Sequence, residues 1–251
     1  TKRECYFDDH IYFPSPFLTM LDSFSLSRQS VAFFMRVALV VAVLSLAFYR
    51  IQTSEAAHAP LQTYNVDASK ITISGFSAGG FMAVQLHGAY SGTFKGAAIV
   101  SGGPYWCAEG NIAKANGQCM ETPETLNPTT YINKLKNTTD RDPWANLADD
   151  KVYLYEGAID TTVDPPAGTK LKDYYLGFVS SANLVLKNDL NSEHSMVTDL
   201  YGSPCTTNAS PWINDCDFDL AGTYLTHLYG TLNARGTYNS ANMLAYNQTE
   251  G

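Results

Sequence analysis

The residue best suited to chemistry is Ser77, the centre of the motif Gly75-Phe76-Ser77-Ala78-Gly79. The β-branched run Ile71–Ile73 precedes this motif, and a helical pattern over Phe81–Ala89 follows it. A G-x-S-x-G sequence between a strand and a helix is typical of a nucleophile elbow, whose strained backbone exposes the serine oxygen. We expect both glycines to be required for closure of the turn, and the Ala78 amide to stabilise an oxyanion. The alternative interpretation is an ordinary Gly/Ser turn.

A serine nucleophile needs a base at neutral pH, and the chain has five histidines. His194 lies in a polar loop after a predicted strand and follows both the serine and the acidic candidates, as the order Ser, Asp, His requires. The competing histidines are less well placed: they are His10, His58, His87 and His227. The sequence therefore predicts His194 as the base, with His227, in the last turn of a helix, as the alternative.

The base in turn needs a carboxylate to orient it. Asp160 comes directly after the turn that ends the predicted strand Lys151–Glu156. Asp164 precedes two prolines and has the pattern of a turn that leads into a helix. We predict Asp160 as the acid, while Asp164, Asp189 and Asp199 remain alternatives.

The elements that would position these residues alternate between strand and helix. Further strands are predicted at Lys95–Val100 and Leu184–Leu186, and further helices at about 129–137, 168–177 and Asp217–Leu228, the last capped by Gly230. This order predicts an α/β fold with a mostly parallel sheet flanked by helices. Because ligands bind at the carboxyl ends of such strands, the three candidate residues are expected to meet there.

Composition limits the possible functions. The 251 residues suffice for one sizeable domain, and 45% of them are hydrophobic. A net charge of −8 and a pI near 5.0 argue against nucleic acid as a partner. No cysteine or histidine spacing typical of a metal site occurs. The expected partner is an ester substrate, and no metal or cofactor is expected.

The N-terminal region has the pattern of an export signal. Met35-Arg36 precedes the apolar run Val37–Phe48, and the small residues Ala56, Ala57 and Ala59 follow. We therefore expect an upstream segment of doubtful status at 1–34, a signal peptide at 35–59 and a catalytic domain at 60–251. The predicted location is extracellular, with no stable membrane span after cleavage of the signal.

The cysteines support the same prediction. Four of the five follow the signal, as expected of a secreted domain, and each neighbouring pair brackets a short loop. We predict disulfides between Cys107 and Cys119 and between Cys205 and Cys216. Acceptor sequences for N-glycosylation begin at Asn137, Asn208 and Asn247.

Four stretches together resemble the poly(3-hydroxybutyrate) depolymerase family of serine esterases. They are ITISGFSAGGFMAVQLHGAYSGTFKGAAIVSGGPYWCA from Ile71, GAIDTTVDP from Gly157, HSMVTDLYG from His194 and SPWINDCDFDLAGTYLTHLYG from Ser210. The resemblance runs from about Pro60 to Asn247. It implies an exported α/β-hydrolase without a cofactor, with Ser77 as nucleophile, Asp160 as acid and His194 as base. It also implies polyhydroxyalkanoate or short hydroxyacid esters as substrates.

The chain departs from an ordinary α/β-hydrolase because too few residues lie between Pro60, the start of the predicted catalytic domain, and Ser77 to form the usual first strands. The resemblance implies a circularly permuted order, in which those strands and an H-G-C oxyanion segment follow the last helix. No such segment occurs before Gly251. We therefore expect a C-terminally truncated domain that lacks its second oxyanion donor and part of its sheet.

Three aromatic residues are candidates for substrate contact: Tyr105, Trp106 and Trp212. Buried packing is the alternative for each of them. Two further functions remain open. One is an esterase for small or plant-wall esters such as acetyl or feruloyl groups, and the other is an inactive surface-binding protein that keeps the fold.

Overall fold

The structure is a computed structural model that describes residues 63–246. The chain divides into two compact units, one of Tyr64–Tyr238 and one of Thr1–Thr63 with Asn239–Gly251. The described part of the second unit contains only a short 3₁₀ turn, η6 (Ser240–Asn242). The predicted upstream segment, signal peptide and acceptor Asn247 lie outside the described residues.

A four-stranded parallel sheet forms the centre of the unit Tyr64–Tyr238, in the order β1-β2-β3-β4. Its strands are β1 (Ile73–Phe76), β2 (Gly96–Val100), β3 (Lys151–Tyr155) and β4 (Leu184–Lys187). The first strand begins and ends later than the β-branched run suggested, because pairing with β2 runs from Ile73 to Phe76. The predicted parallel α/β architecture is confirmed.

Each crossover between neighbouring strands contains helical structure. The α-helices are α2 (Ala78–Ala89), α3 (Ile112–Lys114), α4 (Pro128–Asn137), α5 (Pro166–Tyr175) and α6 (Leu220–Tyr229). The 3₁₀ segments are η1 (Ala68–Lys70), η3 (Pro123–Thr125), η4 (Trp144–Asp149) and η5 (Ser181–Asn183), and η2 (Ala115–Glu121) is a π-helix. Side-chain caps explain two of the starts: Asn127 accepts from the Thr129 amide, and Asp219 accepts from the Gly222 amide. Helix α6 therefore begins three residues later than predicted, and Gly230 ends it with φ 83°.

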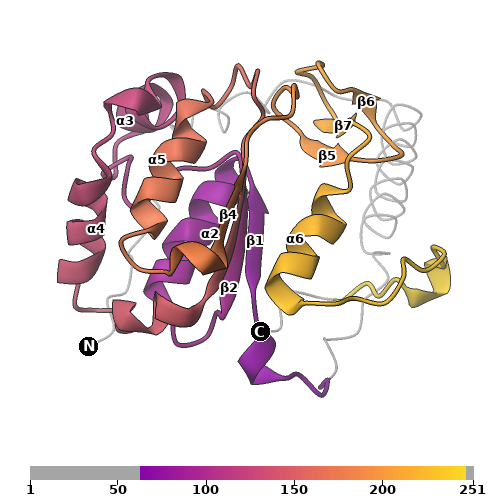
Figure 1. The fold of residues 1–251 in the computed structure, drawn as a ribbon, viewed down its shortest axis with the longest axis horizontal. Helices are drawn as coiled ribbons and strands as arrows, with labels where there is room; N and C mark the ends of the chain where they lie inside the picture. Colours follow the sequence, from indigo (N-terminus) through magenta and orange to yellow (C-terminus); the bar gives the residue numbers. More distant parts are fainter. Residues whose placement is uncertain (1–62, 247–251) are drawn as a thin grey trace, which may run out of the picture. The chain divides into compact units, whose positions relative to one another are not determined.

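The sheet separates two hydrophobic clusters, because successive side chains along β3 point to opposite faces. Val152 and Leu154 pack with α2, α4 and α5 on one face. Tyr153 and Tyr155 pack with Leu220 of α6 on the other face. Figure 1 shows α2, α4 and α5 on one side of the strands and α6 on the other. Because the helices cover the two faces of the sheet, loops lie at the carboxyl ends of its strands.

A second, smaller sheet was not predicted. Its strands are β5 (Met196–Thr198), β6 (Ser203–Pro204) and β7 (Ile213–Asp215), paired in the order β5-β7-β6. It follows His194 directly in the chain, and Val197 anchors it to the cluster under α6. The loop that carries His194 therefore lies between two sheets.

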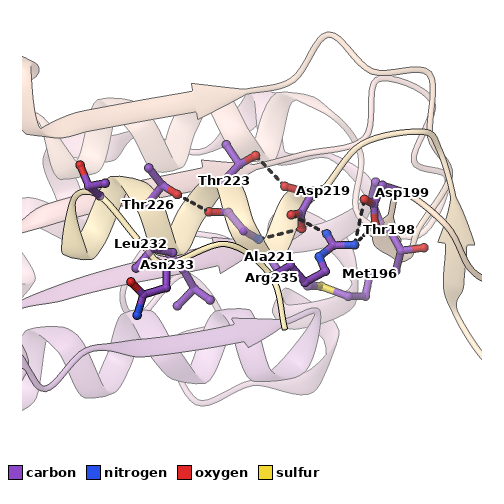
Figure 2. A pocket seen from close by; sticks show the side chains of 14 residues that line it. Met196, Thr198, Asp199, Asp219, Ala221, Thr223, Thr226, Leu232, Asn233 and Arg235 are labelled. Atoms are coloured by element: carbon purple, nitrogen blue, oxygen red, sulfur yellow. Dashed lines mark hydrogen bonds and ion pairs between the residues drawn. The ribbon is translucent and has the colours of Figure 1, made fainter. Parts of the chain in front are cut away.

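A wide cavity of about 1020 Å³ opens beside α6 (Figure 2). Arg235 closes one side of it through ion pairs with Asp199 at 3.0 Å and Asp219 at 2.6 Å. None of the three candidate catalytic residues lines this cavity. Across residues 63–246, no helix has the length and apolarity needed to cross a bilayer.

Candidate active site

Ser77 forms the junction between β1 and α2. Its backbone has φ 55° and ψ −122°, a conformation that residues with a side chain rarely adopt. The Ser77 amide donates to the Val100 carbonyl at 2.9 Å, which fixes the turn to the end of β2. The strained elbow expected from the motif is therefore present in the structure.

The pair of glycines that the elbow requires is not the pair that was expected. A Cβ atom on Gly75 would lie 2.0 Å from the Gly79 carbonyl oxygen, so this position must be glycine for the turn to close. Apart from its chain neighbours and the backbone of its own helix, a Cβ atom on Gly79 would meet no described atom within 4 Å, so the prediction that Gly79 must be small was wrong. The second tight position is Gly80, whose Cβ would lie 2.8 Å from the Val100 carbonyl oxygen.

Ala78 is the first residue of α2. Amides in the first turn of a helix have no intrahelical acceptor, so the Ala78 amide is available to an anion. Ala78 also lines a cavity that reaches Ser77. Its position fits the predicted oxyanion donor.

His194 lies in the loop between β4 and β5. Its Nε2 atom is 2.8 Å from the Ser77 Oγ atom, across a sequence separation of 117 residues. The Phe76 ring packs against the imidazole with centroids 4.7 Å apart. The Glu193 carboxylate accepts from the His194 amide at 3.2 Å and from the Thr161 amide at 3.0 Å. Glu193 thus ties the loop of His194 to the loop that carries Asp160.

Asp160 lies just past the end of β3 and is almost fully buried. Its Oδ2 atom is 2.7 Å from His194 Nδ1, and its Oδ1 atom accepts from the Thr162 and Val163 amides at 2.8 Å each. Burial opposes ionisation of this carboxyl, but the hydrogen bonds from His194, Val163 and Thr162 outweigh burial and hold its pKa below the usual value. The carboxylate form is the one that can orient an imidazole.

The structure therefore brings Ser77, His194 and Asp160 into one hydrogen-bonded chain. Such a chain can transfer the serine proton to the imidazole while the carboxylate stabilises the resulting imidazolium. This arrangement is competent for acyl transfer.

Sequence reasoning missed Ser101 and Glu193. The buried Ser101 hydroxyl donates to Asp160 Oδ2 at 3.0 Å, and its backbone has φ 48°. Ser101 follows β2 directly, so its place at a strand end was a usable signal. Glu193 precedes the predicted base and offered no comparable signal, since its partners belong to a distant loop.

The competing histidines have other partners. His87 is buried on α2, where its ring contacts the Asp150 carboxylate and the Tyr175 hydroxyl at 3.1 Å each. His227 donates to the Asn183 carbonyl at 2.9 Å. His10 and His58 lie outside the described residues.

The competing carboxylates also lie in other networks. Asp189 pairs with Lys187 at 2.6 Å, and Asp199 pairs with Arg235. The amide of Asp164 donates to the Met120 carbonyl at 2.8 Å, and its carbonyl accepts from Ala167 at the start of α5. None of the three contacts the histidine in the hydrogen bonds of the described residues.

Two cavities reach Ser77. One, of about 440 Å³, has a mostly apolar lining that includes Phe81, Trp106 and Met120. The other, of about 500 Å³, is lined by Phe76, Ser77, Thr162, His194, Asn208 and Trp212. Tyr105 lines neither of them and packs against the hydrophobic core. Of the three aromatic candidates, the two tryptophans lie where a substrate could contact them.

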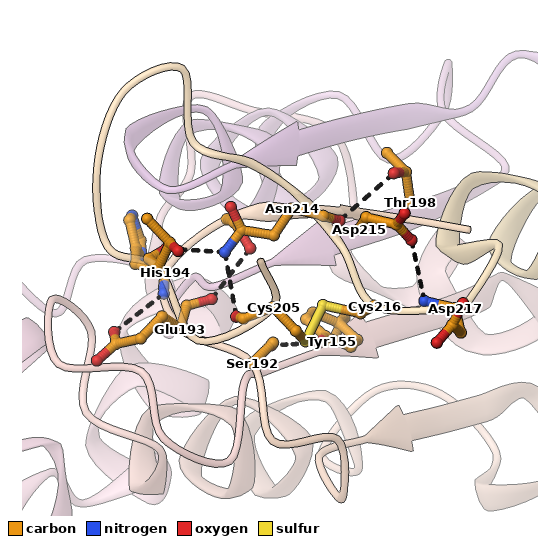
Figure 3. The surroundings of a disulfide bond; sticks show 12 residues. Tyr155, Ser192, Glu193, His194, Thr198, Cys205, Asn214, Asp215, Cys216 and Asp217 are labelled. Atoms are coloured by element: carbon orange, nitrogen blue, oxygen red, sulfur yellow. Dashed lines mark hydrogen bonds between the residues drawn. A yellow bond between two sulfur atoms is a disulfide. The ribbon is translucent and has the colours of Figure 1, made fainter. Parts of the chain in front are cut away.

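Both predicted disulfides are present. The Cys107–Cys119 bond lies in the wall of the 440 Å³ cavity. Figure 3 shows the Cys205–Cys216 bond close to Ser192, Glu193 and His194. The side-chain amide of Asn214 donates to the Cys205 carbonyl at 3.1 Å, and the backbone amide of Glu193 donates to the same carbonyl at 3.0 Å. This disulfide therefore supports the loop of His194.

No cluster of three or more potential metal ligands occurs in the described part of the chain. The acceptor Asn137 is exposed at the end of α4. Asn208 is also exposed, but its side-chain Nδ2 atom donates to the Thr161 hydroxyl at 3.1 Å and to the Thr162 hydroxyl at 2.9 Å.

Comparison with known proteins places this site in a family. The profile of the prolyl oligopeptidase family matches residues 52–214. A poly(3-hydroxybutyrate) depolymerase of Delftia acidovorans is 48% identical over 196 residues, which cover 76% of this chain and 40% of that protein. A polyhydroxybutyrate depolymerase of Talaromyces funiculosus is 35% identical over 192 residues, which cover 73% of this chain and 55% of that protein.

Solved structures give the same result. The crystal structure of a PHB depolymerase from Penicillium funiculosum matches with a TM-score of 0.66 and 34% identity, over 72% of this chain and 57% of that chain. A serine-to-alanine variant of PHB depolymerase, complexed with an R3HB trimer, matches to the same extent. The chain thus spans about half the length of these relatives.

The fold is that of an α/β-hydrolase. The chain belongs to the prolyl oligopeptidase family, and its resemblance to the poly(3-hydroxybutyrate) depolymerases is confirmed.

Proposed function

We propose that this chain is the catalytic region of a secreted serine esterase that hydrolyses poly(3-hydroxybutyrate) or related polyhydroxyalkanoates. The observation that carries the proposal is the hydrogen-bonded chain from Ser77 through His194 to Asp160 in a relative of depolymerases. The two disulfides and the signal-like segment at 35–59 support export.

In the first half of the reaction, Ser77 Oγ attacks the ester carbonyl while His194 Nε2 takes its proton. Asp160 holds the imidazole with Nδ1 protonated, which leaves Nε2 free to accept. The carbonyl oxygen becomes an oxyanion, and the Ala78 amide at the N-terminus of α2 donates to it. His194 then returns the proton to the leaving alcohol, and the acyl group remains on Ser77.

In the second half, a water molecule attacks the acyl-enzyme by the reverse route. His194 removes a proton from the water and returns it to Ser77 Oγ as the tetrahedral intermediate collapses, which breaks the acyl–serine bond and releases a hydroxyacid. Each step uses only the three side chains and the amide, so no metal or cofactor takes part in this mechanism.

The lining of the two cavities fits a polyester better than a charged substrate. Phe81, Met82 and Ile112 are among the apolar residues that line the 440 Å³ cavity. Trp106 and Trp212 remain 41% and 45% exposed, so each can contact a chain that extends out of the site. A hydroxyalkanoate chain has alternating apolar and ester groups that match this lining.

A second candidate is hydrolysis of acetyl or other small esters on plant-wall polymers. A probable acetylxylan esterase A of Aspergillus terreus is 28% identical over 110 residues, which cover 42% of this chain and 34% of that protein. The same three side chains would serve either substrate.

The test compares the two substrate classes on one preparation. The proposal predicts clearing of a poly(3-hydroxybutyrate) suspension, loss of clearing in Ser77→Ala, and no release of acetate from acetylated xylan. Acetate release without clearing would favour the second candidate. Failure of the folded chain to act on either substrate, or on a soluble p-nitrophenyl ester, would contradict an esterase function.

A further inference from the structure

Glu156 is a buried acidic residue that the mechanism does not use. It follows the last residue of β3, and its amide donates to the Lys187 carbonyl of β4 at 3.0 Å. The side chain is fully buried. Gly168 of α5 covers it closely, because a Cβ atom at that position would lie 2.8 Å from Glu156 Cβ. The structure thus holds this carboxyl at a fixed place.

Neither carboxyl oxygen of Glu156 receives a hydrogen bond of normal geometry from the described residues. No ion pair to Glu156 exists there either. The turn after β3 brings Asp160 back toward this side chain, because the Asp160 amide donates to the Gly157 carbonyl at 3.2 Å. After burial, interaction with the Asp160 carboxyl raises the pKa of Glu156 further, while the Ser101 hydroxyl and the Gly157 amide lower it. Two carboxylates without a cation between them repel, so the pair is stable only if one carboxyl keeps its proton.

The hydrogen bonds decide which carboxyl is ionised. Asp160 accepts from His194, Ser101 and the amides of Thr162 and Val163. Glu156 lacks such donors, and burial together with the charge of Asp160 raises its pKa well above the usual value. Tyr155 is a further ionisable neighbour: burial raises its pKa to about 12, and interaction with Glu156 contributes to that shift. The proton therefore resides on Glu156.

We propose that Glu156 is a positioning residue whose protonated carboxyl donates a hydrogen bond to Asp160 and thereby orients that carboxylate toward His194. This inference rests on the proposed role of Asp160 in the catalytic chain. Glu156 contacts neither the nucleophile nor the base directly, and it acts through Asp160 alone. The bond also limits the electron density on Asp160 that is available to the imidazole.

The protonation state is tested on the wild-type chain. Infrared spectroscopy at neutral pH is expected to show the carbonyl band of one buried protonated carboxyl, which is absent in Glu156→Gln and present in Glu124→Gln. Glu124 is an exposed glutamate and serves as the matched control. A wild-type spectrum without this band would overturn the proposal, and that result does not depend on esterase activity.

The hydrogen bond to Asp160 is tested by NMR of the His194 Nδ1 proton. Glu156→Gln keeps a donor of the same shape, so this resonance should keep its wild-type position. Glu156→Met keeps the volume but removes the donor, which strengthens the His194 bond to Asp160 and should move the resonance downfield. A resonance that is unchanged in Glu156→Met, or that moves equally in both variants, would overturn the proposal and leave Glu156 with a packing role.

Fluorophosphonate labelling of each variant separates this inference from the proposed function. The expected result is a labelling rate in Glu156→Gln above that of Glu156→Met by about tenfold, the value of one hydrogen bond to a charged group. Labelling of Ser77 together with an unchanged His194 resonance in Glu156→Met would refute the positioning role alone. Absence of labelling in the wild type would refute the esterase.

Discussion

Replacement of Gly75 by alanine tests the elbow that presents the nucleophile. The new Cβ atom would lie 2.0 Å from the Gly79 carbonyl oxygen, 2.3 Å from its carbon and 2.8 Å from the Gly80 nitrogen. Such contacts essentially never fall below 3.0 Å, so the first turn of α2 must move away from β1 by about the difference. All three atoms belong to the backbone, and no side chain can rotate to relieve the contact.

The magnitude follows from the size of this displacement. Overpacking costs about 1–3 kcal/mol of folding free energy, and a backbone clash belongs at the upper end. We therefore expect Gly75→Ala to lower the free energy of unfolding by about 3 kcal/mol. A misplacement of about 1 Å in a catalytic group also costs on the order of 100-fold in rate. The labelling of Ser77 by a fluorophosphonate should slow by about that factor.

Urea unfolding and labelling kinetics measure the two effects separately. The matched control is Gly79→Ala, because its Cβ would meet no other described atom within 4 Å. Its free energy of unfolding should stay within about 1 kcal/mol of the wild type, since alanine is preferred over glycine in a helix. The reasoning is refuted if both variants are equally stable, or if Gly75→Ala is labelled at the wild-type rate.

Three further predictions concern residues around the site. Ser101→Ala removes one donor from the buried Asp160 carboxylate and should slow labelling about tenfold, measured by labelling kinetics; an unchanged rate would contradict its supporting role. Glu156→Gln should stabilise the chain, increasingly so at higher pH. Because the pKa of Glu156 is raised in the folded wild type, the folded chain keeps a proton that the unfolded chain releases above the usual pKa of 4.5. Between this value and the folded pKa, each pH unit therefore lowers the free energy of unfolding of the wild type by about 1.4 kcal/mol. Urea unfolding between pH 4 and 8 checks this, and a parallel stability profile of both proteins would contradict it. Replacing Cys205 and Cys216 by serine should lower the free energy of unfolding by about 3 kcal/mol, since the bond spans 11 residues; loss of less than 1 kcal/mol in urea unfolding would be the opposite outcome.

The parts of the site that were predictable are those governed by strand ends. Ser77, Asp160 and His194 each follow a predicted strand, and parallel strands bring their carboxyl ends together. Chain order, together with its place in a loop after a predicted strand, then separated His194 from the other histidines. These inferences needed only local patterns and one topological rule.

Other features depend on tertiary contacts that leave no local pattern. The motif pointed to Gly79, but the second close approach is at Gly80, because the end of β2 passes beside the first turn of α2. In the sequence, Glu156 is the polar last residue of a predicted strand, and only the structure shows that α5 covers it and buries its carboxyl. The position of the Ser101 hydroxyl depends on a backbone with positive φ, and the hydrogen bonds of Glu193 depend on a loop that is distant in sequence.

Short elements were missed for a related reason. The strands of the second sheet contain two or three residues, which is too few to establish an alternating pattern. Helix α6 was placed early because its N-cap, Asp219, is one of three aspartates between 215 and 219. Only the geometry shows which of them caps the helix.

The central claim is that Ser77 is a nucleophile activated by His194. Its most direct test is labelling of the chain with a fluorophosphonate, followed by tandem mass spectrometry of the labelled peptide. The account predicts one modified residue, Ser77, and loss of the label in both Ser77→Ala and His194→Ala. A folded chain that stays unlabelled, or that carries the label on another serine, would contradict it.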